Sequence, residues 1–224
     1  MSEPVIELEA VAVRYGRALA LERATGGFAS GSLTALVGAN GAGKSTLLKV
    51  VAGVLAPSAG RVVRRVSDRE IAYLPQSAEI DRDFPITAGD FVLAGGWRRV
   101  GAFGGIPADL RRAAEAALAA VGMADLAQRG IGALSGGQFQ RLLFARLILQ
   151  DARVILLDEP FAALDAATVA DLVDLIRAWH AAGRTVVAAL HELDLVREVF
   201  PETLKLARAP LAWGPTAEVL RGAA

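Results

Sequence analysis

The amino-acid sequence predicts an α/β fold with a mostly parallel sheet, an N-terminal antiparallel β subdomain and an inserted helical subdomain. Short apolar runs alternate with helical patterns near both ends of the chain, as in units of strand, helix and parallel strand with right-handed crossovers. Between these ends the strand signals vanish and helical spacing takes over. We therefore expect one domain over residues 4–221, with the helical subdomain inserted at about residues 80–150.

The N-terminal strands are predicted from alternation and from glycine positions. Apolar residues alternate with polar or small ones along residues 6–13, as in a half-buried strand. After a turn, a second strand is expected at residues 19–21, and the glycine pair at 26–27 is expected to end it. Two further short strands are predicted at residues 60–66 and 71–74.

The predicted helical subdomain contains two clear helices. Apolar residues at helical spacing along residues 110–121 predict the first, and Gly122 fits its C-terminal stop. A second helix is expected after Gly136 and Gly137, with its apolar residues at 142–149.

The C-terminal third returns to alternating strands and helices. Residues 154–157 form a short apolar run, which is typical of a buried parallel strand. Asp165 is expected to cap a helix over residues 166–181, and Gly183 to end it. Another buried strand is predicted at residues 185–190. This alternation implies a parallel sheet.

Composition limits the classes of function. The 224 residues have a net charge of +0, so no overall basic surface argues for nucleic acid. The absence of cysteine excludes disulfides, zinc–cysteine sites and iron–sulfur ligation by this chain. No apolar stretch of about 20 residues predicts a membrane span, and the acidic N-terminus is unlike a signal peptide. We expect a cytosolic protein that reaches a membrane only through a partner.

A phosphate-binding loop is the strongest local signal. Residues 38–46 read GANGAGKST, match G-x-x-x-x-G-K-[ST], and lie between an apolar run at 33–37 and a helix-like run at 47–54. Glycines let successive amides face one anion, Lys44 would reach the β- and γ-phosphates, and Ser45 would ligate Mg²⁺. The alternative, a glycine-rich turn before an unrelated helix, does not account for every fixed position. The predicted nucleotide-binding residues of this loop are Gly38, Ala39, Asn40, Gly41, Ala42, Gly43, Lys44, Ser45 and Thr46.

An acidic pair follows the buried run in VILLDEP, residues 154–160. Asp158 falls at the C-terminal end of the predicted strand, where open α/β sheets bind ligands, and it would hold Mg²⁺. Glu159 is positioned to polarise the attacking water as general base. The alternative is that this pair only caps the next helix.

LSGGQ is the third signal. Ser135 is a good N-cap, and two glycines expose backbone N–H groups at a helix start, so a second anion site is predicted in the same chain. On its own the segment is more typical of an ordinary helix start. Its residues are Leu134, Ser135, Gly136, Gly137 and Gln138.

The order of these segments resembles that of one large ATPase family. The chain carries, in order, GANGAGKST, Gln76 in YLPQ, LSGGQ, VILLDEP, ALD at residues 163–165, and His191. From about Ile6 to Leu220 it is similar to the ATP-binding-cassette (ABC) transporter ATPases. The resemblance implies a P-loop NTPase core that uses ATP and Mg²⁺. It also implies a head-to-tail homodimer in which each nucleotide lies between the phosphate loop of one copy and LSGGQ of the other.

The resemblance also implies roles for single residues. Tyr15 would stack on adenine, and Gln76 would contact Mg²⁺ and the attacking water and sense the transmembrane partner. Asp165 would make a dimer contact, and His191 would contact the γ-phosphate. The catalytic set is then Glu159, His191, Gln76 and Lys44, and the Mg²⁺ set is Ser45, Gln76 and Asp158. The alternatives are that Tyr15 packs at a turn, that Gln76 is an ordinary loop residue, that Asp165 only caps a helix, and that His191 is structural.

A narrower resemblance lies in residues 73–97. The segment Asp81 to Thr87 looks like the D-x-D-F-P-x-T segment of bacterial zinc and manganese importer ATPases, and Thr87 is expected to cap the next helix. This implies an ATP-hydrolysing subunit that is peripheral on the cytoplasmic face of the inner membrane. Its partners would be a permease, met by the apolar Phe84-Pro85 pair, and a periplasmic or surface metal-binding protein. An iron-chelate or other solute transporter, or a soluble ABC ATPase without a transporter, remains open, and residues 97–105 receive no role.

Overall fold

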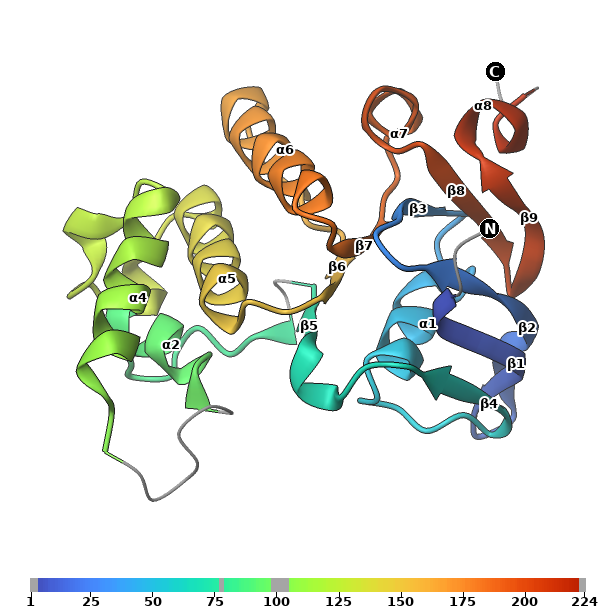
Figure 1. Ribbon diagram of the computed structural model, residues 1–224, viewed down its shortest axis with the longest axis horizontal. Coiled ribbons are helices and arrows are strands. Elements are labelled where there is room, and N and C mark those ends of the chain that lie inside the picture. Colours follow the sequence, from blue (N-terminus) through green and yellow to red (C-terminus); the bar gives the residue numbers. More distant parts are fainter. Residues whose placement is uncertain (1–3, 77–78, 98–104, 222–224) are drawn as a thin grey trace. The chain divides into compact units, whose positions relative to one another are not determined.

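The computed structural model describes residues 4–76, 79–97 and 105–221 (Figure 1). It divides into two compact units. The sheet unit comprises Met1–Pro75, Arg153–Pro160 and Leu175–Ala224, and the helical unit comprises Gln76–Ala152 and Phe161–Asp174. The predicted limits of the inserted subdomain stay a prediction.

The sheet unit contains two sheets. The three-stranded antiparallel sheet has the order β2-β1-β4, with β1 at Pro4–Tyr15, β2 at Ala18–Ala29 and β4 at Ala59–Arg64. The six-stranded sheet has the order β5-β6-β7-β3-β8-β9 and is parallel except for the β8–β9 pair. Its strands are β3 (Leu33–Val37), β5 (Ile71–Leu74), β6 (Val154–Asp158), β7 (Thr185–Ala189), β8 (Glu202–Ala207) and β9 (Ala209–Pro215). The predicted antiparallel and parallel parts are both present.

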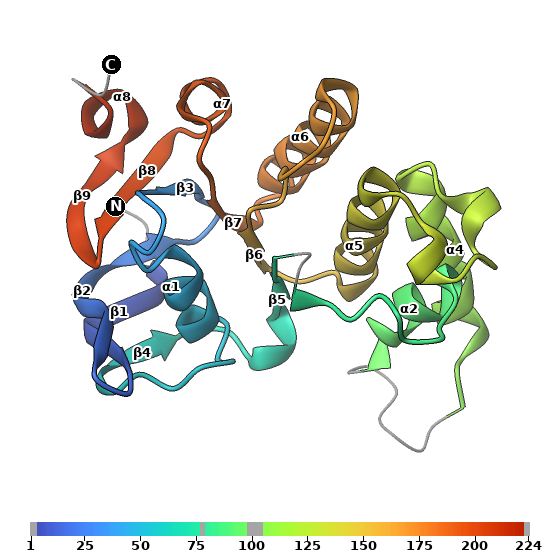
Figure 2. The same ribbon diagram turned by 180° about the vertical axis from the view of Figure 1, so that it is seen from behind.

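Helix α1 (Lys44–Val51) shares one hydrophobic core with both sheets (Figure 1, Figure 2). Strands β3, β6 and β7 are buried along their whole length, which is why their sequences are mostly apolar and lack a polar–apolar alternation. The helix ends earlier than the predicted run to residue 54, because Gly53 adopts φ +77° and turns the chain. The unit also holds the 3₁₀ turn η1 (Asp68–Glu70) and the helices α7 (Leu193–Val199) and α8 (Thr216–Val219).

The expected end of the second strand at residues 26–27 is wrong, because β2 runs on to Ala29. Gly26 has φ +140°, and a Cβ there would lie 2.5 Å from the indole ring of Trp213. That indole, on β9, packs against Phe28 with ring centroids 4.8 Å apart. The glycine therefore makes room for an aromatic side chain from a distant part of the chain and does not break the strand.

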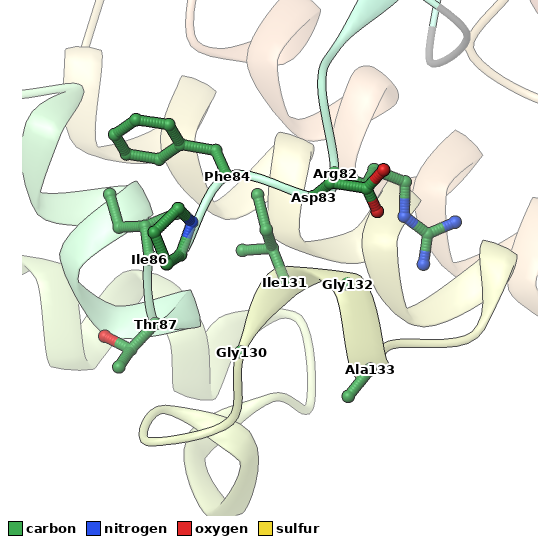
Figure 3. A pocket seen from close by; sticks show the side chains of 10 residues that line it. Arg82, Asp83, Phe84, Ile86, Thr87, Gly130, Ile131, Gly132 and Ala133 are labelled. Carbon is green, nitrogen blue, oxygen red and sulfur yellow. The ribbon is translucent and has the colours of Figure 1, made fainter.

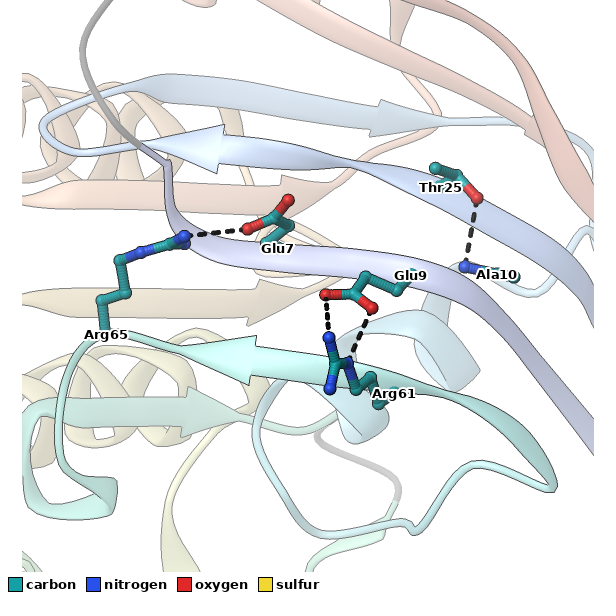
Figure 4. A network of polar contacts seen from close by, with 6 residues as sticks. All are labelled: Glu7, Glu9, Ala10, Thr25, Arg61 and Arg65. Atoms are coloured by element: carbon teal, nitrogen blue, oxygen red, sulfur yellow. Dashed lines mark hydrogen bonds and ion pairs between the residues drawn. The ribbon is translucent and has the colours of Figure 1, made fainter.

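Strand β1 contains an irregularity that cross-strand contacts accommodate (Figure 4). Ala10 has φ +49°, and its N–H donates to Thr25 Oγ1 on β2 at 3.1 Å, while the register with β4 shifts between Glu9 and Ala12. Next to this bulge, Arg61 donates to both carboxylate oxygens of Glu9 and lowers the pKa of that carboxyl. The pair lies on the surface, so it fixes the register of β1 on β4 more than it stabilises the fold.

Among its described residues, the helical unit is built on three packed helices, α2 (Ala88–Ala94), α4 (Ala108–Ala120) and α5 (Gly136–Gln150). As predicted, Gly122 follows α4 in a left-handed conformation, with φ +68°. The 3₁₀ turns η3 (Ala124–Leu126) and η4 (Ile131–Ala133) connect α4 to α5. Helix α6 (Ala166–Ala181) begins in this unit and ends in the sheet unit. Within the described residues, we find no helix with the length and apolar character that a membrane crossing requires.

Candidate functional site

The phosphate-binding loop leaves β3 after Val37 and leads into α1 at Lys44. Gly41 and Gly43 have φ of +78° and +97°, a region that side chains disfavour. A Cβ at Gly43 would also lie 2.5 Å from the carbonyl oxygen of Ala20, so a side chain there would collide with backbone. These two positions therefore require glycine for local reasons, and the loop turns its backbone tightly before the helix start.

The side chain of Lys44 folds back onto the backbone of this loop. Only 5% of the residue is exposed, and Nζ donates to the carbonyl oxygens of Gly38 at 2.8 Å and Ala39 at 3.3 Å. Burial lowers the pKa of Lys44, while the nearby Glu159 and Asp158 oppose that shift. The loop thus holds an ammonium group over its own backbone, where an incoming phosphate would compete with the carbonyls for it.

Asp158 lies at the C-terminal end of β6 and is completely buried. Its Oδ1 accepts a hydrogen bond from Ser45 Oγ at 3.0 Å, and its Oδ2 accepts one from Tyr73 Oη at 3.3 Å. A hydroxyl and a carboxylate in contact supply oxygen ligands of the kind Mg²⁺ prefers, with phosphates and water completing its shell. Among the residues that the structure describes, no group of three or more His, Cys, Asp or Glu side chains suits a metal.

Tyr73 was not among the predicted site residues. It lies on β5, which pairs with β6 in parallel, and its neighbour Leu74 is the register partner of Leu157. The pairing of these two strands places the phenol near the carboxylate. The sequence gives no strand order, so the only available signal was a polar tip in the strand just before YLPQ.

The structure brings Glu159 and His191 together, a contact that is not predicted from the sequence. Each follows the C-terminal end of a strand, β6 for the glutamate and β7 for the histidine, and these strands are neighbours. Glu159 Oε1 and His191 Nε2 are 2.7 Å apart, and the Glu159 N–H donates to the carbonyl of Ala189 at 3.2 Å. Both side chains remain partly exposed, so water can reach the carboxylate.

Tyr15 ends β1 and is 52% exposed. An aromatic ring with this exposure is accessible for stacking on a planar ligand, and the alternative for a tyrosine at a turn is local packing. Gln76 follows β5 and Pro75, is half-buried, and belongs to the helical unit.

The LSGGQ segment, called the signature segment below, forms the start of α5 in the helical unit. Ser135 is its N-cap, with Oγ accepting from the Gln138 N–H at 3.2 Å. In return, the Ser135 N–H donates to Gln138 Oε1 at 3.0 Å, which completes a capping box. Leu134 is buried, while Ser135 and Gly136 are exposed. The predicted N-cap is therefore present on an accessible helix start.

Asp165 is the N-cap of α6, as one of its two interpretations predicts. Its Oδ1 accepts from the Thr168 N–H and its Oδ2 from Thr168 Oγ1, each at 2.9 Å. These hydrogen bonds lower the pKa of the Asp165 carboxyl. The residue is exposed and thus accessible to a second copy, and the dimer contact stays a prediction.

The helical unit also contains a groove of about 470 Å³ (Figure 3). Two segments line it, residues 82–87 and residues 130–133, and we call it the helical-unit groove. Phe84 in the first segment is 60% exposed. Thr87 caps α2 by accepting from the Asp90 N–H at 3.1 Å, as predicted.

Comparison with known proteins decides the family. The family model described as ABC transporter matches residues 21–162. This chain belongs to the ABC transporter family. It is an ABC ATPase domain that binds and hydrolyses ATP, which confirms the predicted fold class and activity.

Individual relatives resemble the chain over nearly its whole length. A probable metal transport system ATP-binding protein of Chlamydia pneumoniae is 41% identical, over 94% of this chain and 83% of that protein. A manganese transport system ATP-binding protein of Synechocystis sp. is 39% identical, over 95% of this chain and 85% of that protein. A solved ABC transporter in an inward-facing conformation, assigned to the metal-chelate type, has a TM-score of 0.86 at 29% sequence identity. The match covers 97% of this chain and 86% of that chain.

Proposed function

We propose that this chain is the ATP-hydrolysing subunit of a bacterial importer for zinc or manganese ions. The observation that carries the ATPase mechanism is the pair of contacts at neighbouring strand ends, Ser45 with Asp158 and Glu159 with His191. The choice of metal ions is supported by the named transport systems of the relatives and by the segment Asp81–Thr87. An ATPase of this kind needs a permease partner, which fits the transport systems to which the relatives belong.

In the proposed mechanism, the loop amides and Lys44 bind the β- and γ-phosphates of ATP. Ser45 and Asp158 would hold Mg²⁺, which supplies positive charge to the phosphate oxygens when bound. Glu159 accepts a proton from water as the water oxygen bonds to the γ-phosphorus and the bond to ADP breaks. His191 holds the Glu159 carboxylate in this structure, and an arriving γ-phosphate would compete for the same imidazole.

The second half of each site would come from another copy of the chain. Exposed amides at the start of α5 in one copy would meet the γ-phosphate bound by the loop of the other. Tyr15 would stack on adenine, Asp165 would contact the partner copy, and Gln76 would report the state of the permease. ATP would then favour the closed dimer because it binds that form better than the open one.

The helical-unit groove is the proposed docking place of the permease. An exposed Phe84 beside Pro85 supplies apolar surface at its rim (Figure 3). We propose peripheral association with the cytoplasmic face of the inner membrane through this groove, and a periplasmic or surface metal-binding protein on the opposite side.

Uptake measurements in cells that depend on this chain test the proposal. Cells carrying the wild-type chain should accumulate radioactive manganese or zinc, and cells carrying Glu159→Gln should not. If uptake of an iron chelate alone depends on the chain, the iron-chelate alternative replaces the proposal. If the purified chain hydrolyses ATP but no solute uptake depends on it, a soluble ABC ATPase is the correct description.

A further inference from the structure

The turn before α5, the helix that begins within the signature segment, needs a hydrogen-bond donor from outside the helix. The first helical bond of α5 runs from the Phe139 N–H to the Ser135 carbonyl at 2.9 Å, so the carbonyl of Leu134 lies outside the helical pattern. Leu134 is only 4% exposed. Buried carbonyl groups are almost always paired, since leaving one without a donor is costly.

Arg82 supplies that donor. Its Nη2 donates to the carbonyl oxygen of Leu134, and its guanidinium carbon lies 4.7 Å from the centroid of the Phe139 ring. Leu134 directly precedes Ser135, and Phe139 lies one helical turn after it. One side chain therefore contacts the first residue of the signature segment through a charged hydrogen bond, and the residue directly after that segment through a cation–π contact.

The backbone of Arg82 is close to the same turn. A Cβ at Gly132 would lie 2.9 Å from the carbonyl oxygen of Arg82, so the two linings of the helical-unit groove touch at this point. Residue 132 belongs to η4, which leads directly into Leu134. Figure 3 shows the side chains of Arg82 and Phe84 directed away from each other, with Phe84 toward the rim of the groove.

We infer that Arg82 is a positioning residue. It holds the signature segment, at the start of α5, in the conformation that meets a nucleotide bound by a second copy of the chain. Because Arg82 also lines the groove, a partner bound there would act on the signature segment through the same residue. This positioning role rests on the proposed function in one respect, namely that Ser135 meets a nucleotide bound by another copy.

The chemistry requires arginine at this place. A planar guanidinium stacks on a ring and donates to a carbonyl at the same time, whereas a lysine ammonium keeps the charge and a donor but has no flat face. Among the described residues Arg82 Nε has no acceptor, so the stack and the Nη2 bond carry the contact. Arg82→Lys therefore separates the charge from the stacking.

A second arginine gives a matched control. Arg146 lies on α5 in the same unit, with its guanidinium carbon 4.9 Å from the centroid of the Phe91 ring on α2. Its ring partner belongs to α2, whereas the ring partner of Arg82 lies on α5 directly after the signature segment. Arg146→Ala removes a comparable contact and reports on general destabilisation of the helical unit.

The experiment uses full-length Glu159→Gln as the parent, with Arg82→Ala, Arg82→Lys or Arg146→Ala added. Binding of a fluorescent ATP analogue measures the phosphate loop, and analytical ultracentrifugation with ATP measures the dimer. Arg82→Ala should weaken the dimer about tenfold or more, as expected for loss of one charged hydrogen bond, with ATP binding changed less than about twofold. Arg82→Lys should recover part of the loss, and Arg146→Ala should behave like the parent.

Each other outcome has a definite meaning. If the parent dimerises with ATP and Arg82→Ala dimerises equally well, Arg82 has no positioning role while the proposed function stands. Equal weakening by Arg82→Ala and Arg146→Ala also overturns the role, because the effect is then general. A wild-type chain that does not hydrolyse ATP, with a parent that does not dimerise, overturns the proposed function, and the positioning role is rejected with it.

Discussion

The sheet unit and the helical unit each present a helix start suited to a phosphate, but the two starts are held differently. In the sheet unit, Lys44 and Ser45 are fixed by the loop carbonyls and by the buried Asp158. In the helical unit, the side chain of Ser135 is engaged in its own capping box, and exposed backbone amides remain to face a ligand. The side chains proposed for catalysis thus belong to the sheet unit, with the exception of Gln76. The signature segment offers exposed backbone amides that would meet a nucleotide bound by a second copy.

The largest expected effect comes from the lysine of the phosphate loop. Lys44→Ala should lower steady-state phosphate release at least about a hundredfold, because it removes the buried charge meant for the β- and γ-phosphates. Lys49→Ala, a lysine on the same helix, is the matched control and should retain most activity. Near-normal turnover of Lys44→Ala would mean that the sheet unit does not carry the chemistry.

A smaller effect should separate docking from chemistry in the helical unit. Phe84→Ala should leave ATP binding and basal hydrolysis intact, since Phe84 belongs to the groove and not to the loop. Stimulation by the permease should fall at least about fivefold, as for an interface side chain worth about 1 kcal/mol. Leu211→Ala removes a similarly exposed apolar side chain from β9 and should change neither quantity. Unchanged co-purification and stimulation for Phe84→Ala would remove the main support for docking at the groove.

The smallest effect tests how firmly the sheet unit fixes its own carboxylate. Tyr73→Phe removes only the hydroxyl that donates to Asp158 at 3.3 Å. It should raise the Mg²⁺ concentration needed for tight ATP binding by about threefold to tenfold, at or below the usual effect of a group that orients a metal ligand, because this hydrogen bond is long. Calorimetric titration of ATP at several Mg²⁺ concentrations measures this shift. Tyr15→Phe, which removes the same atom from the predicted stacking ring, should show none.

Local signals explain what the sequence predicts well. The glycines before Lys44, the cap residues Ser135 and Thr87, and the uniformly apolar run of β6 each follow from neighbouring residues alone. Asp158 could be placed at a strand end because that end is visible in the sequence. The same holds for Glu159.

Contacts between distant segments account for what was missed. The bond from Tyr73 to Asp158 depends on β5 lying beside β6, and the glycine at 26 is explained only by the indole of Trp213. The contact of Arg82 with Leu134 likewise joins separate segments of the helical unit. Strands β8 and β9 also escaped prediction, although they complete the sheet beside β3. Strand order and long-range packing are not written in any local pattern.

The central claim is that ATP joins the sheet unit of one copy to the signature segment of another. Glu159→Gln keeps the size and hydrogen bonding of the side chain but cannot act as base, so ATP should accumulate in a dimer. Adding Ser135→Arg places bulk at the exposed helix start and should disperse that dimer while each monomer still binds nucleotide.

Size-exclusion chromatography with light scattering, with ATP or ADP present, measures this directly. We predict a dimer for Glu159→Gln with ATP, a monomer with ADP, and a monomer for the double variant with either nucleotide. The account is contradicted if the double variant dimerises as well as Glu159→Gln, or if Glu159→Gln stays monomeric with ATP even when the permease is present.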